Sequence, residues 1–123
     1  MRGIVDRFGV SAGRIWSVLS EKGCIGRDEL LDFSGLNEFD LYTGLGWLAR
    51  EGKVVLNEDV YCLGEGDFNS LIGAYAGKVW RILDVWGGAD FVTIKRLSDL
   101  DDIDIHSALG WLGREDKIDV DER

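Results

Sequence analysis

The sequence LGWLAREGKV at residues 45–54 recurs almost unchanged as LGWLGREDKI at residues 109–118. The segment AGRIW at residues 12–16 recurs as AGKVW at residues 76–80, at the same offset of 64 positions. The register holds between the two segments without a gap, and 16 of the 47 aligned positions are identical. A repeat of this length, with tryptophans and glycines kept in register, indicates two tandem copies of one structural unit.

Apolar residues spaced at i, i+3, i+4 and i+7 predict that each copy begins with an amphipathic helix. They are Ala12, Ile15, Trp16 and Leu19 in the first copy, and Ala76, Val79, Trp80 and Leu83 in the second. Gly23 and Gly87 follow these stretches. We expect them to end the two helices, because glycine is common just past a helix C-terminus.

A short second helix is expected around residues 27–33 and 93–97, with two inward-facing apolar residues in each copy. These are Leu30 and Phe33, and Ile94 and Leu97. A tight turn with one buried leucine then leads to Asn37 or Asp101, whose side chains are suited to cap the N-terminus of a third helix. A helix, a short helix, a turn and a longer helix make a helix-turn-helix.

After the third helix, residues 53–56 and 60–63 are two short β-prone runs around the polar turn at 57–59. This pattern predicts a β-hairpin, the wing of a winged helix. The second copy offers only residues 117–120 before the sequence ends at Arg123, so we expect its wing to be truncated. The predicted fold class is mainly α with small β-hairpin wings (α+β), a tandem winged helix-turn-helix of two three-helix units.

The predicted boundary between the units lies at the short stretch 64–67. Unit 1 covers residues 1–64, and unit 2 covers residues 65–123. So short a connection favours two units that pack against each other over two that move independently.

These motifs resemble those of a family of small prokaryotic winged helix-turn-helix proteins whose function is not established. The resemblance rests on the A-G-[KR]-[IV]-W and L-G-W-L-x-R-E-x-K-[IV] segments, and it extends over nearly the whole chain, twice. Members of the family usually carry one unit. The resemblance implies the fold but little about function, because one fold hosts many functions. The doubling raises the hypothesis that the pair of units replaces a homodimer.

Composition limits where the protein works and what it binds. The net charge of −9 disfavours nucleic acids and other polyanions. No apolar run approaches the roughly 18 residues of a membrane span, and residues 1–6 lack the apolar stretch of a signal peptide. We therefore expect a cytoplasmic protein that makes no membrane contact. Cys24 and Cys62 are accordingly expected to be reduced thiols, with a disulfide or a metal pair as the alternatives.

Two binding functions are open to this fold, protein contact and DNA recognition. In a DNA-binding helix-turn-helix, the third helix of each copy would enter the major groove. Its candidate residues are Glu38, Tyr42 and Arg50 in the first copy, and Asp102, His106 and Arg114 in the second. Both helices start with acidic residues, which repel phosphate, and the wing turn is acidic as well.

We therefore favour a protein–protein interaction or adaptor module over a DNA-binding transcriptional regulator. A basic patch formed in space would support the DNA alternative. The residues that could build it are Arg2, Arg7, Arg14 and Arg27.

The second copy gains aromatic residues where the first copy is polar. Tyr75 replaces Ser11, Trp86 replaces Lys22 and Phe91 replaces Arg27. Such an asymmetry indicates an interface with a partner, with burial between the units as the alternative. Ile118 and Val120 mark the open strand edge of the truncated wing, a site for β-augmentation unless the N-terminal residues or the first unit cover it. The protein would be a monomer with packed tandem units, or a homodimer joined through this edge.

Four tryptophans and two glycines form the structural signature of the repeat. They are Trp16, Trp47, Trp80 and Trp111, with Gly46 and Gly110. Trp47 and Trp111 are predicted to lie in the core or between the units, with ligand stacking as the alternative. Glycine inside a helix costs about 1 kcal/mol relative to alanine, so its presence in both copies indicates that a backbone or a large ring approaches closely. The Arg-Glu pairs that follow are expected to interact locally at the helix ends.

We expect no enzymatic activity, since the sequence has no phosphate-binding glycine loop of the usual spacing and no nucleophile motif. No cofactor, metal or small-molecule substrate is expected. His106 is the only histidine, and without a nearby Cys/His cluster it makes a poor metal site, so we expect it to be exposed. The acidic run at 101–104 lacks the glycine and the final glutamate of an EF-hand loop.

Overall fold

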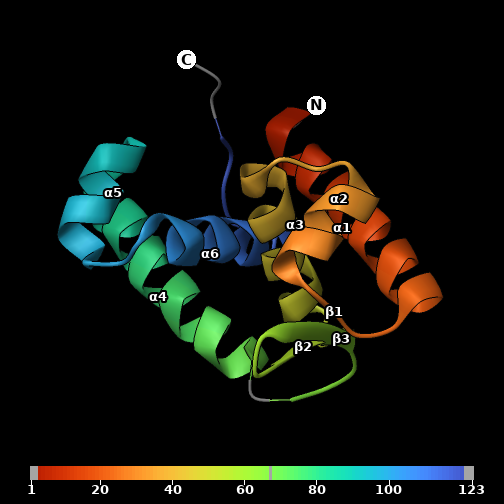
Figure 1. Cartoon of the computed structure of the whole chain (residues 1–123). Helices are drawn as coiled ribbons and strands as arrows, with labels where there is room; N and C mark the ends of the chain where they lie inside the picture. Colours follow the sequence, from red (N-terminus) through yellow and green to blue (C-terminus); the bar gives the residue numbers. More distant parts are fainter. Residues whose placement is uncertain (1–2, 67, 121–123) are drawn as a thin grey trace.

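The computed structural model of the chain describes residues 3–66 and 68–120. Helices dominate these residues, and the few strands form one small sheet (Figure 1). The elements in chain order are α1 (Gly3–Lys22), β1 (Ile25–Gly26), α2 (Arg27–Ser34), α3 (Glu38–Arg50), β2 (Val54–Asn57), β3 (Val60–Leu63), α4 (Phe68–Trp86), α5 (Phe91–Ser98) and α6 (Asp102–Arg114). The predicted class is confirmed, since each half of the chain contributes a long helix, a short helix and a third helix.

The helix ends follow the predicted capping chemistry. Asn37 and Asp101 precede α3 and α6, and each side chain accepts a hydrogen bond from the backbone N–H three residues later. Gly23 and Gly87 follow α1 and α4 in the left-handed region, with φ angles of 79° and 74°. The helix α5 begins two residues earlier than predicted, because Asp90 caps it in the same way as the other two caps.

The wing of the first half is a three-stranded antiparallel sheet in the order β1-β3-β2. Residues 54–57 of β2 oppose residues 60–63 of β3 in reverse order, which confirms the predicted hairpin. On the other edge of β3, Ile25 of β1 lies opposite Tyr61. The sequence did not predict β1, because two residues are too few to show the alternation that marks a strand.

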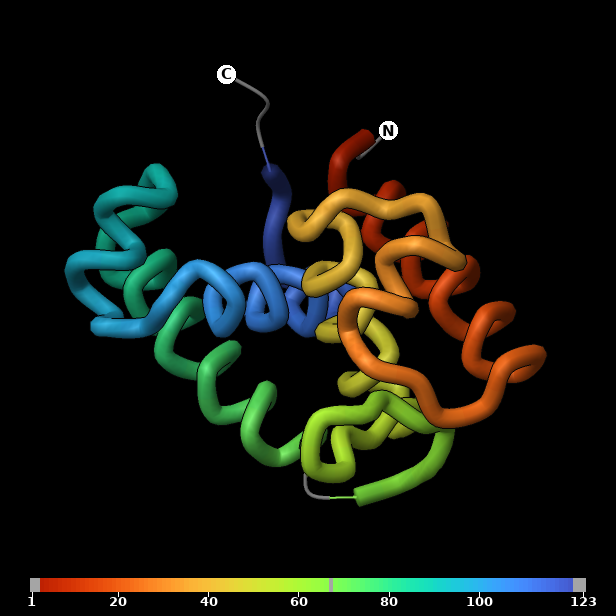
Figure 2. Tube along the Cα trace, in the orientation of Figure 1, coloured from red at the N-terminus to blue at the C-terminus, as the bar shows by residue number. Residues whose placement is uncertain are grey.

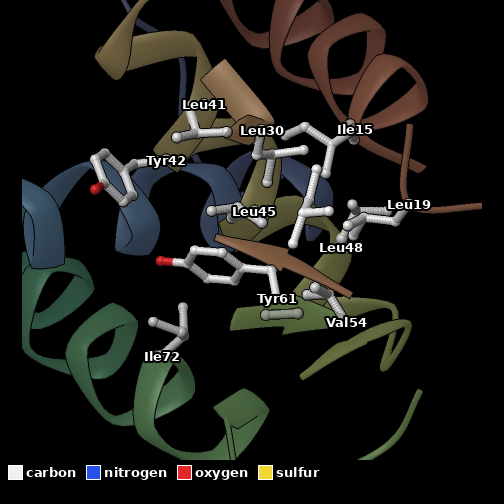
Figure 3. Close-up of a cluster of buried hydrophobic side chains, with 13 residues drawn as sticks. Ile15, Leu19, Leu30, Leu41, Tyr42, Leu45, Leu48, Val54, Tyr61 and Ile72 are labelled. Carbon is white, nitrogen blue, oxygen red and sulfur yellow. The ribbon is translucent and has the colours of Figure 1, made fainter. Parts of the chain in front are cut away.

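The larger hydrophobic core lies in the first half, enclosed by α1, α2, α3 and the sheet (Figure 3). Its residues with no exposed surface are Ile15, Leu30, Leu41, Leu45 and Ala49. Ile72 of α4 points into the same cluster, so this core extends into the second copy. A second cluster around Val79, Ile105 and Leu112 lies between α4, α5 and α6.

The third helices α3 and α6 cross at the centre of the molecule, with α1 and α2 on one side and α4 and α5 on the other (Figure 1; Figure 2). They make the most extensive contact of any two elements. A Cβ atom at Gly46 would overlap the carbonyl oxygen of Ser107, and one at Gly110 would overlap that of Thr43. This reciprocal approach of backbone to backbone explains why both copies keep a glycine there.

Two apolar residues of the short helices are not where the sequence predicted them. Phe33 of α2 and Leu97 of α5 are 52% and 42% exposed, so the prediction that they face inward is wrong. Each eight-residue helix turns only one of its two predicted apolar residues into a core, Leu30 in α2 and Ile94 in α5. Lys22 of α1 lies over the exposed Phe33 ring, with its Nζ atom 4.6 Å from the ring centroid.

Cys24 and Cys62 form a disulfide, with their Cα atoms 4.4 Å apart. The expectation of reduced thiols is therefore wrong. The disulfide follows from the antiparallel pairing of β1 with β3. Because Ile25 lies opposite Tyr61, Cys24 lies next to Cys62. The bond ties the end of α1 to the central strand of the wing.

Candidate interaction surface

Trp47 and Trp111 lie beside the crossing of α3 and α6, each in close contact with a glycine of α1 or α4. Each indole ring is covered by an arginine of the other copy. The guanidinium of Arg114 lies 5.9 Å from the Trp47 ring centroid, and that of Arg50 lies 5.6 Å from the Trp111 ring centroid. The two rings thus form part of the contact between the copies.

The Arg-Glu pairs at the ends of α3 and α6 also join the two copies. Arg50 Nε donates to Glu115 Oε2 at 3.1 Å, and Arg114 Nε donates to Glu51 Oε2 at 3.2 Å. Each glutamate also forms an ion pair with the lysine two residues later in the chain. The distance is 3.8 Å between Lys53 Nζ and Glu51 Oε2, and 3.7 Å between Lys117 Nζ and Glu115 Oε1. The glutamates thus pair locally with these lysines, as expected, whereas the arginines pair with the other copy because the crossing helices bring the ends of α3 and α6 together.

Trp16 and Trp80, the other two signature tryptophans, lie at the margin of the cores. They are 47% and 40% exposed on α1 and α4. Lys117 covers the second ring, with its Nζ atom 5.6 Å from the Trp80 centroid. The helical spacing predicted these tryptophans to lie with the core residues. They lie instead at the solvent-exposed edge of a broad apolar stripe.

The residues proposed for DNA recognition on α3 are engaged within the protein. Tyr42 is buried, and its hydroxyl accepts a hydrogen bond from Arg27 Nε at 2.6 Å. Arg27 also forms ion pairs with Glu38, at the exposed start of α3, and with Asp28. The hydrogen bond to Tyr42, reinforced by the charge of Glu38, raises the pKa of the Arg27 guanidinium. Arg50 completes the bridge to the other copy at the far end of the helix.

His106 of α6 is half-buried, so the expectation that it is exposed is wrong. Its ring centroid lies 4.9 Å from that of Phe39 in α3 and 5.3 Å from that of Phe91 in α5. Burial lowers the pKa of His106, while the carboxylates of Asp102 and Glu38 oppose that shift. The histidine belongs to an aromatic cluster drawn from both copies, and Arg114 on the same helix bridges back to α3.

The arginines that could have formed a basic patch are occupied locally. Arg7 forms an ion pair with Asp40, at 2.8 Å between Nη2 and Oδ2. Arg14 donates to the carbonyl oxygen of Ser34 at 3.4 Å. Arg2 lies outside the described residues. Each described arginine of this set therefore faces an acceptor within the protein.

The five residues predicted to form an interaction surface occupy four settings. Tyr75 is half-buried and packs against both hydrophobic cores, so it belongs to the contact between the copies. Phe91 is half-buried against the second core. Trp86, at the end of α4, is 60% exposed. Ile118 and Val120 lie in the extended segment after α6 and are half-buried.

Sequence reasoning missed Val85 and Val92, which are 74% and 73% exposed. They lie beside Trp86 and Phe91 in the chain, at the end of α4 and the start of α5. We call these four residues the 85–92 surface. The signal was present in the repeat, because the matching residues of the first copy are all charged, namely Glu21, Lys22, Arg27 and Asp28.

An open hollow lies next to this surface, at the place that β3 occupies in the first copy. It is lined by Trp80, Leu83 and Asp84 of α4, by Gly87 and Gly88, and by residues 117–119. In the first copy the wing sheet buries the matching apolar residues, which are Leu19, Ile25 and Val54. Their counterparts are only half-buried, namely Leu83, Ala89 and Ile118.

Two kinds of feature are absent from residues 3–66 and 68–120. None of their helices has the length and apolar character that crossing a bilayer requires. No group of three or more His, Cys, Asp or Glu side chains there is arranged to hold a metal ion.

A family model described as "Winged helix-turn-helix domain (DUF2582)" matches the chain twice, at residues 4–62 and 67–123. No curated protein and no solved structure matches the chain. The two matches span nearly the whole chain and coincide with the two sets of three helices. The chain therefore belongs to the DUF2582 winged helix-turn-helix family and carries two copies of its domain in tandem.

Proposed function

We propose that this protein is a non-enzymatic adaptor that contacts another protein through its second copy. The observation that carries the proposal is the exchange of charged for apolar residues at four matched positions, which creates the 85–92 surface. The two copies share one fold, so folding alone does not call for this difference. Exposed apolar and aromatic side chains gathered in one stretch are typical of protein-binding sites.

The crossing of α3 and α6 supports protein contact over DNA recognition. A recognition helix needs a free face to lie in the major groove. Nine of the 13 residues of α3 are buried, and Gly46 and Gly110 set each third helix against the backbone of the other. At the exposed starts of the two helices, Glu38 and Asp102 pair with Arg27 and Lys95, so these cations are not free to bind phosphate.

The net charge of −9 suits a basic partner and disfavours a polyanion. We propose a monomer as the working state, because each copy already covers the third helix of the other. The lack of catalysis and the cytoplasmic location expected from the sequence stay predictions of this proposal. The Cys24–Cys62 disulfide counts against the cytoplasmic location, because such bonds are rare in the reducing cytosol.

The proposal is tested by restoring the first copy's residues on the surface of the second. A Val85→Glu, Trp86→Lys variant changes two well-exposed side chains, so we expect it to keep the fold. Val10→Glu is the matched control, since Val10 is an equally exposed apolar residue on α1. Both proteins and the parent chain serve as bait in the native lysate, and bound proteins are quantified. We expect the double variant to capture at least tenfold less partner protein than the parent chain, and the control to capture as much as the parent.

Retention of the same partners by the double variant would contradict a docking role for the 85–92 surface. A mobility-shift measurement with duplex DNA tests the other function of this fold. Binding that weakens steeply between about 50 and 200 mM salt would favour DNA recognition.

A further inference from the structure

We infer that the second copy binds an extended segment of a partner protein as the central strand of its wing, between residues 88–90 and 117–120. The inference rests on the proposed protein-binding function and names how the partner is held. The first copy supplies the template, because there β3 runs between β1 and β2 and pairs with both.

The two flanks of the strand position are present in the second copy. With the offset of 64, Ala89 and Asp90 match β1, and residues 118–120 match the first three residues of β2. Residues 117–120 leave α6 as an extended segment (Figure 2). Within the described part of the chain, residues 118–120 make no backbone hydrogen bond to another element. Their N–H and C=O groups are thus open to an added strand.

The hollow between these flanks has a mixed lining, in which Leu83 and Ile118 are apolar side chains that a strand would cover. Leu19 in the first copy is 2% exposed beneath the sheet, whereas its counterpart Leu83 is half-buried and lines the hollow. The residues that line the hollow all come from the second copy, so the first copy does not fill it. Covering Leu83 and Ile118 would remove apolar surface from water, which favours binding.

The first copy also specifies the side chains of the strand. Tyr61 of β3 is buried, and burial raises its pKa to about 12, so the matching side chain of a bound strand is expected to be apolar or aromatic. The next residue, Cys62, is bonded to Cys24, and Gly88 stands at the matching place in the second copy. Without a side chain at Gly88, the bound strand needs no cysteine there.

Charge specifies the partner further. Asp84 and Asp119 line the hollow together with Lys117, which also pairs with Glu115, so carboxylates outnumber the cation there. The residues that match the two aspartates in the first copy are the uncharged Ser20 and Val55. Carboxylates on both sides of a strand position favour basic residues at the ends of the strand. The occupant is therefore an extended, basic-flanked segment with an apolar or aromatic residue at its second position.

A synthetic peptide, KKVYSLKK, tests the inference on the full chain. Its centre copies residues 60–63 with serine in place of cysteine, and lysines supply the basic flanks. Fluorescence anisotropy of the labelled peptide measures binding, and amide chemical shifts locate it. We expect the amides of residues 88–90 and 117–120 to shift. We expect at least tenfold weaker binding for the glutamate-flanked peptide EEVYSLEE and for KKPYPLKK, whose prolines remove two backbone donors.

A matched pair of variants separates the hollow from the rest of the surface. Asp84→Lys replaces an anion with a cation beside the hollow, and Ser20→Lys places the same cation at the equivalent exposed position of the first copy. We expect the Asp84→Lys variant to bind KKVYSLKK at least tenfold more weakly. We expect the Ser20→Lys variant to bind it like the parent.

Several outcomes would overturn the inference without removing the proposed function. The first is equal binding of the proline peptide. The second is no binding of KKVYSLKK while a partner captured through Val85 and Trp86 is retained. Release of a homodimer by the peptide would assign the hollow to a second copy of this chain and also overturn the inference. Loss of partner capture with peptide binding intact would contradict the proposed function alone.

Discussion

His106 shows how a single exchange changes the chemistry of a matched position. In the first copy, Tyr42 at this place binds Arg27, which also pairs with Glu38. In the second copy, the histidine ring instead lies edge-on to Phe39 and tilted against Phe91. A polar cluster built on ion pairs has thus become an aromatic one that contains the titratable ring of His106.

The lowered pKa of His106 predicts how stability depends on pH. Burial disfavours the protonated ring in the folded state, so the unfolded chain binds a proton more readily between the folded pKa and about 6.5. The contribution of His106 to stability is therefore present above pH 6.5 and is lost as pH falls through the folded pKa. We expect the free energy of unfolding, measured with urea, to decrease from pH 7.5 to pH 5.5.

A His106→Gln variant provides the control, because glutamine keeps a polar side chain that does not titrate. Its stability is expected to change less over the same pH range than that of the parent. Identical pH profiles for the two proteins would show that His106 does not carry the effect.

At the residue scale the sequence predicted what depends on near neighbours. The caps Asn37 and Asp101 follow from the preference of short polar side chains for helix starts. The exposure of Phe33 and the burial of His106 depend on which helix lies across from them. The spacing of apolar residues along one helix does not show which other helix packs against it.

At the element scale, the sequence likewise predicted one part of the wing and missed another. The hairpin of β2 and β3 was predictable, because both strands and their turn are contiguous in the sequence. The addition of β1 was not, since a two-residue strand has no pattern. The disulfide follows from that pairing, so it was missed with it. The sequence predicted an open strand edge in the second copy but not the hollow. The hollow could not be predicted because its shape depends on β3 lying between β1 and β2 in the first copy.

The Cys24–Cys62 bond is expected to contribute strongly to the stability of the wing. It closes a loop with a sequence separation of 38, and loops of this size correspond to about 2–4 kcal/mol of stabilisation. A Cys24→Ser, Cys62→Ser variant should therefore lose about 2–4 kcal/mol in equilibrium urea unfolding under non-reducing conditions.

Dithiothreitol supplies the internal check on that measurement. The reductant should lower the stability of the parent chain to near that of the double variant and leave the variant itself unchanged. A parent chain that is insensitive to the reductant would contradict a stabilising role for the bond.

At the scale of the whole molecule, the two copies meet as the subunits of a symmetric dimer would. Several interactions occur twice with the copies exchanged, as in Arg50 with Glu115 and Arg114 with Glu51. These ion pairs join partly exposed side chains and are worth up to about 1 kcal/mol each. The close packing of α3 on α6, with its reciprocal glycines, is therefore the main source of attachment.

The glycines at this crossing predict how the molecule responds when the copies are forced apart. Alanine at Gly110 would place its Cβ 2.7 Å from the carbonyl carbon of Thr43, and backbone cannot yield as a side chain does. We expect Gly110→Ala to lower the free energy of unfolding by about 3 kcal/mol or more. Gly77→Ala on α4 is the matched control, since nothing lies within 4 Å of its Cβ position, and it should stabilise the protein by about 0.5–1 kcal/mol. Chemical denaturation followed by circular dichroism measures both, and equal effects of the two substitutions would exclude the crossing as the main attachment.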